Sequence, residues 1–115
     1  MLLTIPERLA AIDPAPRKIT AAEAARERAE LNGYVIDVRE PAEHANSPAN
    51  GAINIPRGVL EMKMLELVKD PGTPIFLHCA SGARAMLAAE QLAKMGYQHI
   101  AVMTCDVPTI QKAFK

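Results

Sequence analysis

Short apolar runs of strand length alternate with segments of helical composition along almost the whole chain. The pattern predicts strands at 34–38, 52–55, 75–79 and 99–103, helices at 21–31, 60–68, 83–95 and from about residue 108, and a helical turn at 41–45. Strands that alternate with helices form a parallel sheet with right-handed crossovers. We therefore expect an α/β fold whose central sheet is largely parallel and carries helices on both faces.

The domain organisation follows from the length and from signals near the N-terminus. The chain has 115 residues, 50% of them hydrophobic, which is enough for one compact core and too little for two. Prolines on both sides of Ala15 impose extended backbone, and Thr20 with Glu23 three residues later forms the capping-box pattern that begins a helix. We expect residues 1–17 to form an arm or cap and residues 18–115 to form a single domain.

Charge and cysteine content exclude several classes of protein. The formal net charge is zero, so the chain lacks the basic character that nucleic acids and acidic membrane surfaces attract. The two cysteines are far apart and fit neither a disulfide framework nor a zinc-site spacing. The N-terminus does not resemble a secretory signal, and no apolar run approaches the length that crosses a bilayer. We expect a cytoplasmic protein that binds neither nucleic acid nor membrane.

The predicted strand at 75–79 ends in a cysteine, Cys79, that opens a short loop leading directly into a helix. The N–H groups of a tight loop and of a first helical turn have no partner within the helix, so they point at any anion held at the turn. Together with the helix dipole and the nearby Arg84, they favour the thiolate form of the side chain. A cysteine after an apolar strand is most often a small buried hydrophobic residue, and this loop favours a nucleophile instead.

Three motifs occur in order along the chain: Asp-Val-Arg-Glu-Pro at 37–41, Gly-Ala-Ile-Asn-Ile-Pro at 51–56 and C-x-x-G-x-R at 79–84. With the helix and glycine pattern up to Tyr97, they resemble the single-domain rhodaneses over about residues 18–104. The resemblance implies a rhodanese-like fold for the domain. It also implies a sulfurtransferase that carries sulfur as a persulfide on the loop cysteine, which is Cys79 here.

The resemblance and the loop chemistry together define the candidate site. The thiolate of Cys79 is expected to attack the outer sulfur of thiosulfate, a polysulfide or another persulfide donor, and cyanide, a thiol or a protein acceptor would then remove that sulfur. The loop that follows is expected to hold the anion through its N–H groups. These substrate-binding residues are Ala80, Ser81, Gly82, Ala83 and Arg84. No metal and no organic cofactor are implied.

Individual loop side chains have alternative roles. Gly82 allows a tight turn with left-handed dihedral angles. Arg84 either forks onto an anionic donor or fixes the loop by binding a carboxylate. Ser81 either donates a hydrogen bond to the persulfide or caps the following helix.

Polar residues outside the loop are expected to be structural. Asp37 and Arg39 match the first motif, and such a pair at a strand end commonly anchors loops. His78 is expected to pack within its strand, although it could tune the neighbouring thiolate. His44 and His99 show no partner in the sequence, so we expect each to be a surface residue or a satisfied one.

The second cysteine marks a departure from the family. Rhodanese-like chains usually carry a Gly-Gly pair after the last strand, with a tryptophan beyond it, whereas this chain has Cys105 and Asp106 there and no tryptophan. Cys105 is expected to pack inertly. Alternatively, it resolves the persulfide by forming a disulfide with Cys79, which requires the two Cα atoms to lie within about 7 Å.

Two other functions compete with sulfur transfer. A phosphatase with a related loop uses His-Cys-x5-Arg, because the wider loop cradles three phosphate oxygens, but here Arg84 comes one position early and Ala85 stands at the arginine's place. A module that senses reactive sulfur or binds a protein without turnover would keep the same fold and motifs. The altered segment at 105–106 adds support to the module.

Overall fold

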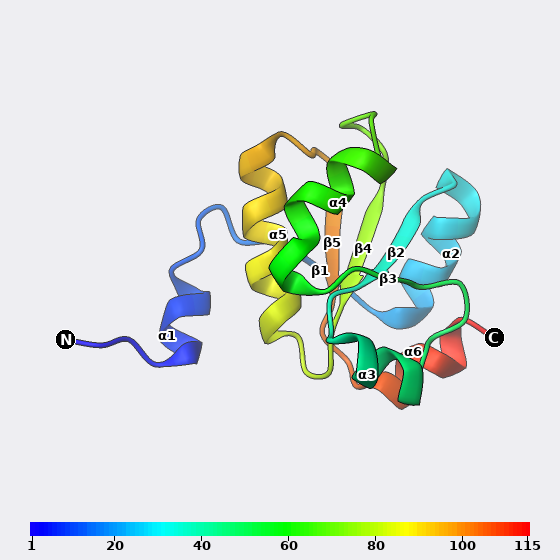
Figure 1. The fold of residues 1–115 in the computed structure, drawn as a ribbon, viewed down its shortest axis with the longest axis horizontal. Helices are drawn as coiled ribbons and strands as arrows, with labels where there is room; N and C mark the ends of the chain where they lie inside the picture. Colours follow the sequence, from blue (N-terminus) through cyan, green and yellow to red (C-terminus); the bar gives the residue numbers. More distant parts are fainter.

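The fold is built on one five-stranded sheet, and the computed structural model describes residues 1–115. All neighbouring strands pair in parallel, in the order β1-β5-β4-β2-β3 (Figure 1). The strands are β1 (Arg17–Ile19), β2 (Tyr34–Asp37), β3 (Ile53–Asn54), β4 (Ile75–His78) and β5 (Ile100–Met103). The prediction of a largely parallel central sheet is confirmed, and the sheet is entirely parallel.

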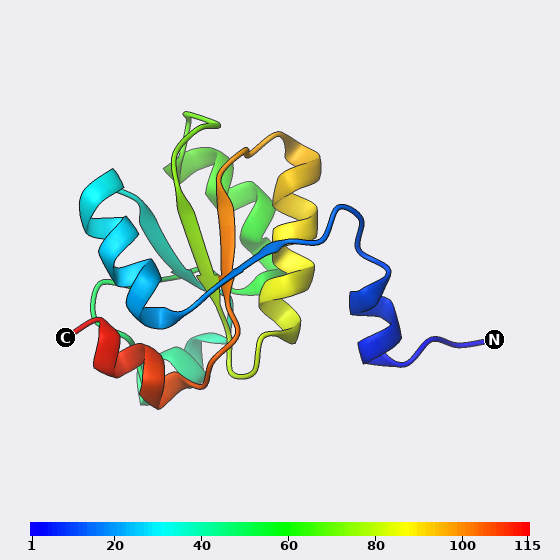
Figure 2. The same ribbon diagram turned by 180° about the vertical axis from the view of Figure 1, so that it is seen from behind.

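Helices cover both faces of this sheet, as Figures 1 and 2 show. The helices are α1 (Ile5–Ala10), α2 (Ala21–Leu31), α3 (Pro41–Asn46), α4 (Leu60–Leu67), α5 (Ala83–Met95) and α6 (Val107–Ala113), with a 3₁₀ turn at Arg57–Val59. One apolar cluster joins α4 and α5 to one face of the sheet, and a second joins α2 and α6 to the other face. The predicted α/β architecture is therefore confirmed.

The predicted helices agree closely with the structure where capping signals are clear. α2 begins after Thr20, whose hydroxyl accepts the N–H of Glu23 while the Glu23 side chain accepts the Thr20 N–H. It ends at Asn32, which adopts a left-handed conformation with φ of 57°. Local hydrogen bonding sets both ends, and for this reason the sequence predicts them well.

β1 is the strand that the sequence pattern did not predict. It has three residues at the edge of the sheet, and Arg17 and Lys18 are exposed whereas Ile19 is buried. A single buried residue leaves no alternating pattern to detect. β1 forms through its backbone pairing with β5.

The residues before β1 partly join the domain. α1 packs against α5, where Arg8 binds Glu90 at 2.6 Å and Ile12 is buried in the cluster shared with α5. The first residues extend away from the body, so the two termini lie at opposite ends of the molecule (Figure 1). None of the helices has the length and apolar character that crossing a membrane requires.

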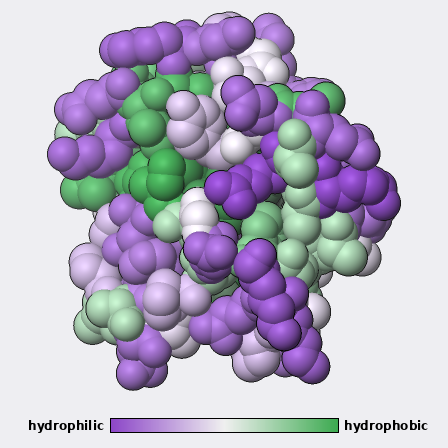
Figure 3. All heavy atoms as spheres, turned by 90° about the vertical axis from the view of Figure 1, so that its right-hand side faces the viewer, coloured by the Kyte–Doolittle hydropathy of each residue, from purple (hydrophilic) through white to green (hydrophobic).

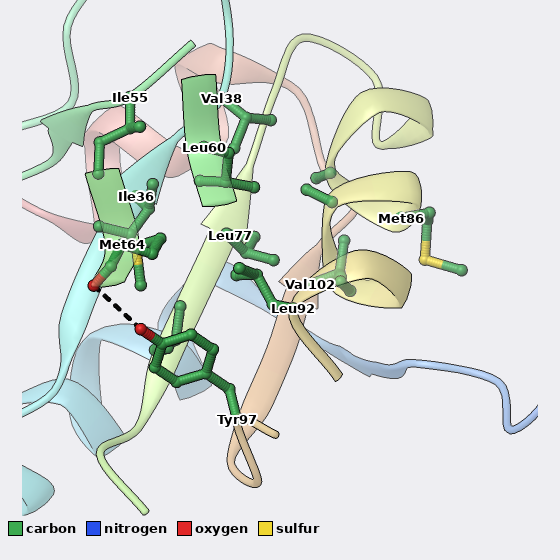
Figure 4. Close-up of a cluster of buried hydrophobic side chains, with 14 of the residues drawn as sticks. Ile36, Val38, Ile55, Leu60, Met64, Leu77, Met86, Leu92, Tyr97 and Val102 are labelled. Atoms are coloured by element: carbon green, nitrogen blue, oxygen red, sulfur yellow. Dashed lines mark hydrogen bonds between the residues drawn. The ribbon is translucent and has the colours of Figure 1, made fainter. Parts of the chain in front are cut away.

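The apolar cluster between α4, α5 and the sheet packs against β4. Leu60 and Met64 from α4 and Leu92 from α5 pack onto Leu77 of β4 (Figure 4). The Tyr97 hydroxyl completes this region by contacting the backbone oxygens of residues 64 and 68 at 2.9 and 2.8 Å. β4 is thus held on a rigid apolar base up to the point where the functional loop starts.

One edge of the molecule carries exposed apolar side chains. Ile53, Val59 and Leu67 line a shallow groove between β3 and α4. In Figure 3, apolar surface breaks an otherwise mainly hydrophilic face. The groove contains none of the predicted site residues.

Candidate active site

The candidate nucleophile lies at the carboxyl end of a central strand. β4 ends at His78, Cys79 follows, and α5 starts at Ala83 after a very short loop. Ligands of open parallel sheets bind outside the carboxyl ends of the strands, so this position suits a reactive group. Cys79 is only 1% exposed and packs in the apolar cluster with α4 and α5.

Two backbone N–H groups point at the Cys79 sulfur. Gly82 N donates to Sγ at 3.1 Å and Ala85 N donates at 3.4 Å. Donors that converge on a sulfur stabilise its anionic form by the same fixed-dipole effect that operates in an oxyanion hole. The Gly82 donor lies within the predicted loop, whereas Ala85 lies one residue beyond it and was not predicted.

Gly82 adopts the backbone conformation predicted for it. Its φ is 103°, in the left-handed region that favours glycine, and it is the N-cap residue of α5. A Cβ at this position would lie 3.4 Å from Thr104 Cγ2, which is an ordinary contact. The dihedral angle, and not a lack of space, therefore requires glycine here.

The remaining loop residues are at least partly exposed. Ala80 and Ser81 are exposed, and the Ser81 hydroxyl makes no hydrogen bond, so the proposed helix cap by Ser81 is absent. Ala83 and Arg84 are in the first turn of α5, where N–H groups have no partner within the helix. These donors are available to an anion at the loop.

The Arg84 side chain forks onto a carboxylate. Its Nη1 donates to Glu43 Oε1 at 2.6 Å and its Nη2 donates to Glu43 Oε2 at 3.0 Å. Of the two roles considered for this side chain, the structure contains the carboxylate contact. Glu43 belongs to α3 and was not predicted as a site residue, because 41 residues separate it from Arg84.

This ion pair shifts both ionisation equilibria toward the charged forms. The hydrogen bond from Arg84 is the main cause that lowers the pKa of Glu43 to about 2, and the Glu40 N–H adds to the effect. The pKa of Arg84 is raised, first by its hydrogen bond to Glu43 and further by the negative charges of Glu43 and Cys79. Arg84 therefore lies within electrostatic reach of the candidate nucleophile.

A buried pair anchors the segment that carries α3. Arg39 donates from Nε and Nη2 to the Asp37 carboxylate, and the two side chains are 3% and 0% exposed. Arg39 also reaches the side chain and carbonyl of Ser47. The structural role predicted for Asp37 and Arg39 is confirmed. Burial alone raises the pKa of Asp37, but hydrogen bonds from Arg39 and His44 outweigh it and lower the pKa.

The three histidines occupy the kinds of position expected for them. His44 Nδ1 lies 2.9 Å from Asp37 Oδ2 because α3 folds back over the end of β2, so His44 is a satisfied residue whose partner the sequence did not identify. His99 is exposed, as expected. His78 is fully buried and pairs in register with Asp37 on the neighbouring strand. Burial is the main cause that lowers the pKa of His78.

The second sequence motif lies directly beside the first. Asn54 of β3 donates from its side-chain amide to the carbonyls of Asp37 at 3.0 Å and Arg39 at 2.9 Å. The Val38 N–H in turn donates to the His78 carbonyl at 3.0 Å. The three motifs thus meet at one end of the sheet, around the strand end that carries Cys79.

The two cysteines lie on opposite sides of the sheet. Both are free, and Cys105 packs against the cluster with α2 and α6, whereas Cys79 belongs to the cluster with α4 and α5. Asp106 caps α6 by accepting the Thr109 N–H at 3.0 Å. The pair that replaces Gly-Gly therefore contributes a packing residue and a helix cap. No group of three or more His, Cys, Asp or Glu side chains is arranged to hold a metal ion.

Comparison with known proteins places this loop in a family. The model for the rhodanese-like domain matches residues 20–113. The chain is 34% identical over 65 residues to the thiosulfate sulfurtransferase PspE of Escherichia coli, a match that covers 56% of this chain and 62% of that protein. It is 32% identical over 66 residues to a sulfurtransferase of Allochromatium vinosum, a match that covers 57% and 60% of the two chains. The matched region thus spans about three fifths of each of these relatives.

A solved structure extends the comparison to the fold. A Rhodopseudomonas palustris protein, called a possible tyrosine phosphatase, superposes with a TM-score of 0.80 at 21% identity, over 98% of this chain and 92% of that one. At this identity the likeness shows the fold alone. Because the family match covers most of the chain and includes all three motifs, this protein belongs to the rhodanese-like domain family.

Proposed function

We propose that this protein is a sulfurtransferase that accepts a sulfane sulfur as a persulfide on Cys79 and passes it to a thiophilic acceptor. The observation that carries the proposal is the pair of N–H groups, from Gly82 and Ala85, directed at the Cys79 sulfur. This arrangement stabilises a sulfur anion at the end of a central strand. The sulfurtransferases among the relatives support the same reaction class.

The reaction has two displacements on sulfur. In the first, the Cys79 thiolate attacks the outer sulfur of thiosulfate, a polysulfide or another persulfide, and the bond between that sulfur and the rest of the donor breaks. The leaving group, sulfite or a thiolate, takes the electron pair. In the second, cyanide, a thiol or a protein acceptor attacks the outer sulfur of the persulfide, and the Cys79 thiolate leaves. Both steps balance with the thiol alone, so the proposal includes no metal and no organic cofactor.

The loop supplies the anion cradle for the transferred sulfur. Gly82 and Ala85 hold the inner sulfur, and the N–H groups of Ala80, Ser81, Ala83 and Arg84 are the donors for the outer sulfur. This division is supported by the exposure of Ala80 and Ser81 and by the unpaired first turn of α5. Two free cysteines suit a reducing compartment, and we therefore include the cytoplasm in the proposal.

Phosphate transfer is a weaker explanation of the same loop. A phosphatase grips phosphate with the guanidinium at the end of its loop. Here Arg84 is already bound in bidentate fashion to Glu43, and Ala85 occupies the position where a phosphatase has its arginine. The loop has N–H groups for a sulfur atom but no free guanidinium for a phosphate.

The deciding experiment measures sulfur on the protein and its discharge. Reduced protein is mixed with thiosulfate or with polysulfide, and its intact mass is recorded before and after addition of cyanide. We expect a gain of one sulfur atom that is absent in Cys79→Ser, is retained in Cys105→Ser, and is discharged as thiocyanate. Loading without catalytic turnover would favour a sulfur-sensing or protein-binding module. No loading from either donor would refute the proposed transfer.

A further inference from the structure

We propose that Glu43 determines donor specificity: by neutralising Arg84, it directs the loop toward persulfides of thiols and away from the thiosulfate dianion. The inference rests on the proposed sulfur transfer by Cys79 and names the class of donor. Glu43 acts through Arg84, so its role is that of a positioning residue. The sequence singled out Arg84 as a possible donor-binding group, and the structure shows that this group is already occupied.

The guanidinium of Arg84 is engaged through both of its terminal nitrogens. Both terminal nitrogens of the guanidinium bind the two carboxylate oxygens of Glu43, at 2.6 and 3.0 Å. Glu43 is itself fixed from its own helix, because the Glu40 N–H donates to Oε1 at 3.1 Å. The carboxylate therefore has a position that does not depend on Arg84, and it draws the guanidinium toward α3.

The other charges near the loop are also paired. Arg84 is the only cationic residue between residues 79 and 85. Arg39 lies in the neighbouring motif, but it is buried against Asp37, whose carboxylate also contacts His44. A donor that approaches Cys79 thus meets backbone N–H groups and an ion pair without net charge. Within the loop itself, no unpaired cation is placed to receive a second negative charge.

The donors differ in the charge that they bring beside the transferred sulfur. Thiosulfate carries a sulfonate group next to its outer sulfur and releases a sulfite dianion. A persulfide of a neutral thiol carries no sulfonate and releases a thiolate with a single charge. Loop N–H groups suit the single charge of a sulfur anion, whereas the sulfonate needs a cation that Glu43 has already neutralised.

The first test compares two donors with cyanide as the common acceptor. We expect kcat/KM for the persulfide of 2-mercaptoethanol to exceed that for thiosulfate, and Glu43→Gln to reduce this preference about tenfold by freeing Arg84. The double variant Glu43→Gln/Arg84→Gln should restore the preference. Glu27→Gln, which breaks an equivalent bidentate pair with Arg17 outside the loop, is the matched control and should leave the preference unchanged. If Glu43→Gln lowered kcat/KM by the same factor for both donors, the role of Glu43 would be purely structural and the inference would be overturned.

A second test separates this inference from the proposed function. In a Cys105→Ser background, Cys79 is alkylated with anionic iodoacetate and with neutral iodoacetamide. The quantity measured is the ratio of the iodoacetate rate to the iodoacetamide rate. We expect Glu43→Gln to raise the ratio and Arg84→Gln to lower it, each about threefold, with both shifts shrinking in high salt. General loosening of the loop cannot give shifts of opposite sign, so the two variants together distinguish the charge effect from a structural one.

The two failures are distinguishable. If the ratio shifts as expected while no sulfur loads on Cys79, the proposed transfer fails and the charge balance stands. If sulfur loads normally while neither variant shifts the ratio, the role assigned to Glu43 is overturned and the transfer stands.

Discussion

The backbone N–H of Gly82 lies 3.1 Å from the Cys79 sulfur, and it is aimed there by a left-handed dihedral angle, with φ of 103°. The residue that donates to the sulfur is thus also the residue that turns the chain into α5. A change in the conformation of Gly82 therefore moves a donor away from the thiol. The shape of the loop and the environment of the nucleophile cannot vary independently.

Gly82→Ala should slow sulfur loading by more than its small loss of stability explains. A non-glycine residue in this conformation costs about 1 kcal/mol, and the strain is relieved by rotating the N–H away from the sulfur. We expect sulfur loading to slow by about tenfold, as measured by an intact-mass time course. We also expect a small decrease in the free energy of unfolding, as measured by urea denaturation. Gly96→Ala is the matched control, because Gly96 has φ of 110° at the other end of α5 and should lose similar stability without slower loading. Equal loading rates in the two variants would contradict the prediction.

Glu43 should give the protein an acid-sensitive part of its stability. Its pKa is about 2 in the folded protein and 4.5 without its partners, so the unfolded chain takes up the proton first as the pH falls. The stabilisation is fully present above about 4.5 and is lost as the pH falls toward about 2. Because the two side chains are 37% and 39% exposed, the effect should stay below about 1 kcal/mol.

The measurement is urea unfolding of wild type and Glu43→Gln from neutral pH down to about 2. The difference between their unfolding free energies should be constant near neutrality and shrink below 4.5. A difference that persists unchanged at the acid end would show that the charge of Glu43 does not stabilise the fold.

Arg39→Met should be far more costly than removal of an exposed arginine. It leaves the Asp37 carboxylate, which is 0% exposed, with His44, the Arg39 backbone N–H and the more distant His78 Nε2 at 3.9 Å as partners. Breaking a buried pair in this way costs about 3–5 kcal/mol. Arg17→Met, whose side chain is 52% exposed, is the control and should cost less than about 1 kcal/mol. If urea denaturation gave comparable losses of unfolding free energy for Arg39→Met and Arg17→Met, the anchoring role of Arg39 would be refuted.

Much of the fold could be predicted because its signals are local. The capping residues around α2, the apolar run of β4 and the glycine that ends α5 are each recognised within a few residues. The loop that carries Cys79 was predicted for the same reason, since a strand, a short turn and a helix follow one another directly. Local hydrogen bonding and apolar periodicity determine these elements, and both can be read from the sequence.

The parts that could not be predicted depend on contacts between distant segments. Glu43 meets Arg84 only because α3 folds beside the start of α5, and His44 meets Asp37 because α3 turns back over β2. β1 exists as a strand because β5 pairs with it. A donor such as the Ala85 N–H also leaves no signal, since any residue type presents the same backbone group there.

Tyr97→Phe should weaken the fold without touching the site. The Tyr97 hydroxyl contacts the carbonyl of Met64 at 2.9 Å (Figure 4) and that of Val68 at 2.8 Å, and so ties the end of α4 to the segment after α5. Its removal leaves buried carbonyls without this donor and costs about 1–2 kcal/mol. Tyr34→Phe is the matched control, because the Tyr34 hydroxyl makes no hydrogen bond in the structure and its loss should be nearly neutral. Urea denaturation measures the difference, and the rate of sulfur loading should be the same in both variants because Tyr97 lies at the far end of α5 from Cys79. Equal stability of the two variants would show that the bridge between α4 and α5 contributes nothing to the rigid base beneath the loop.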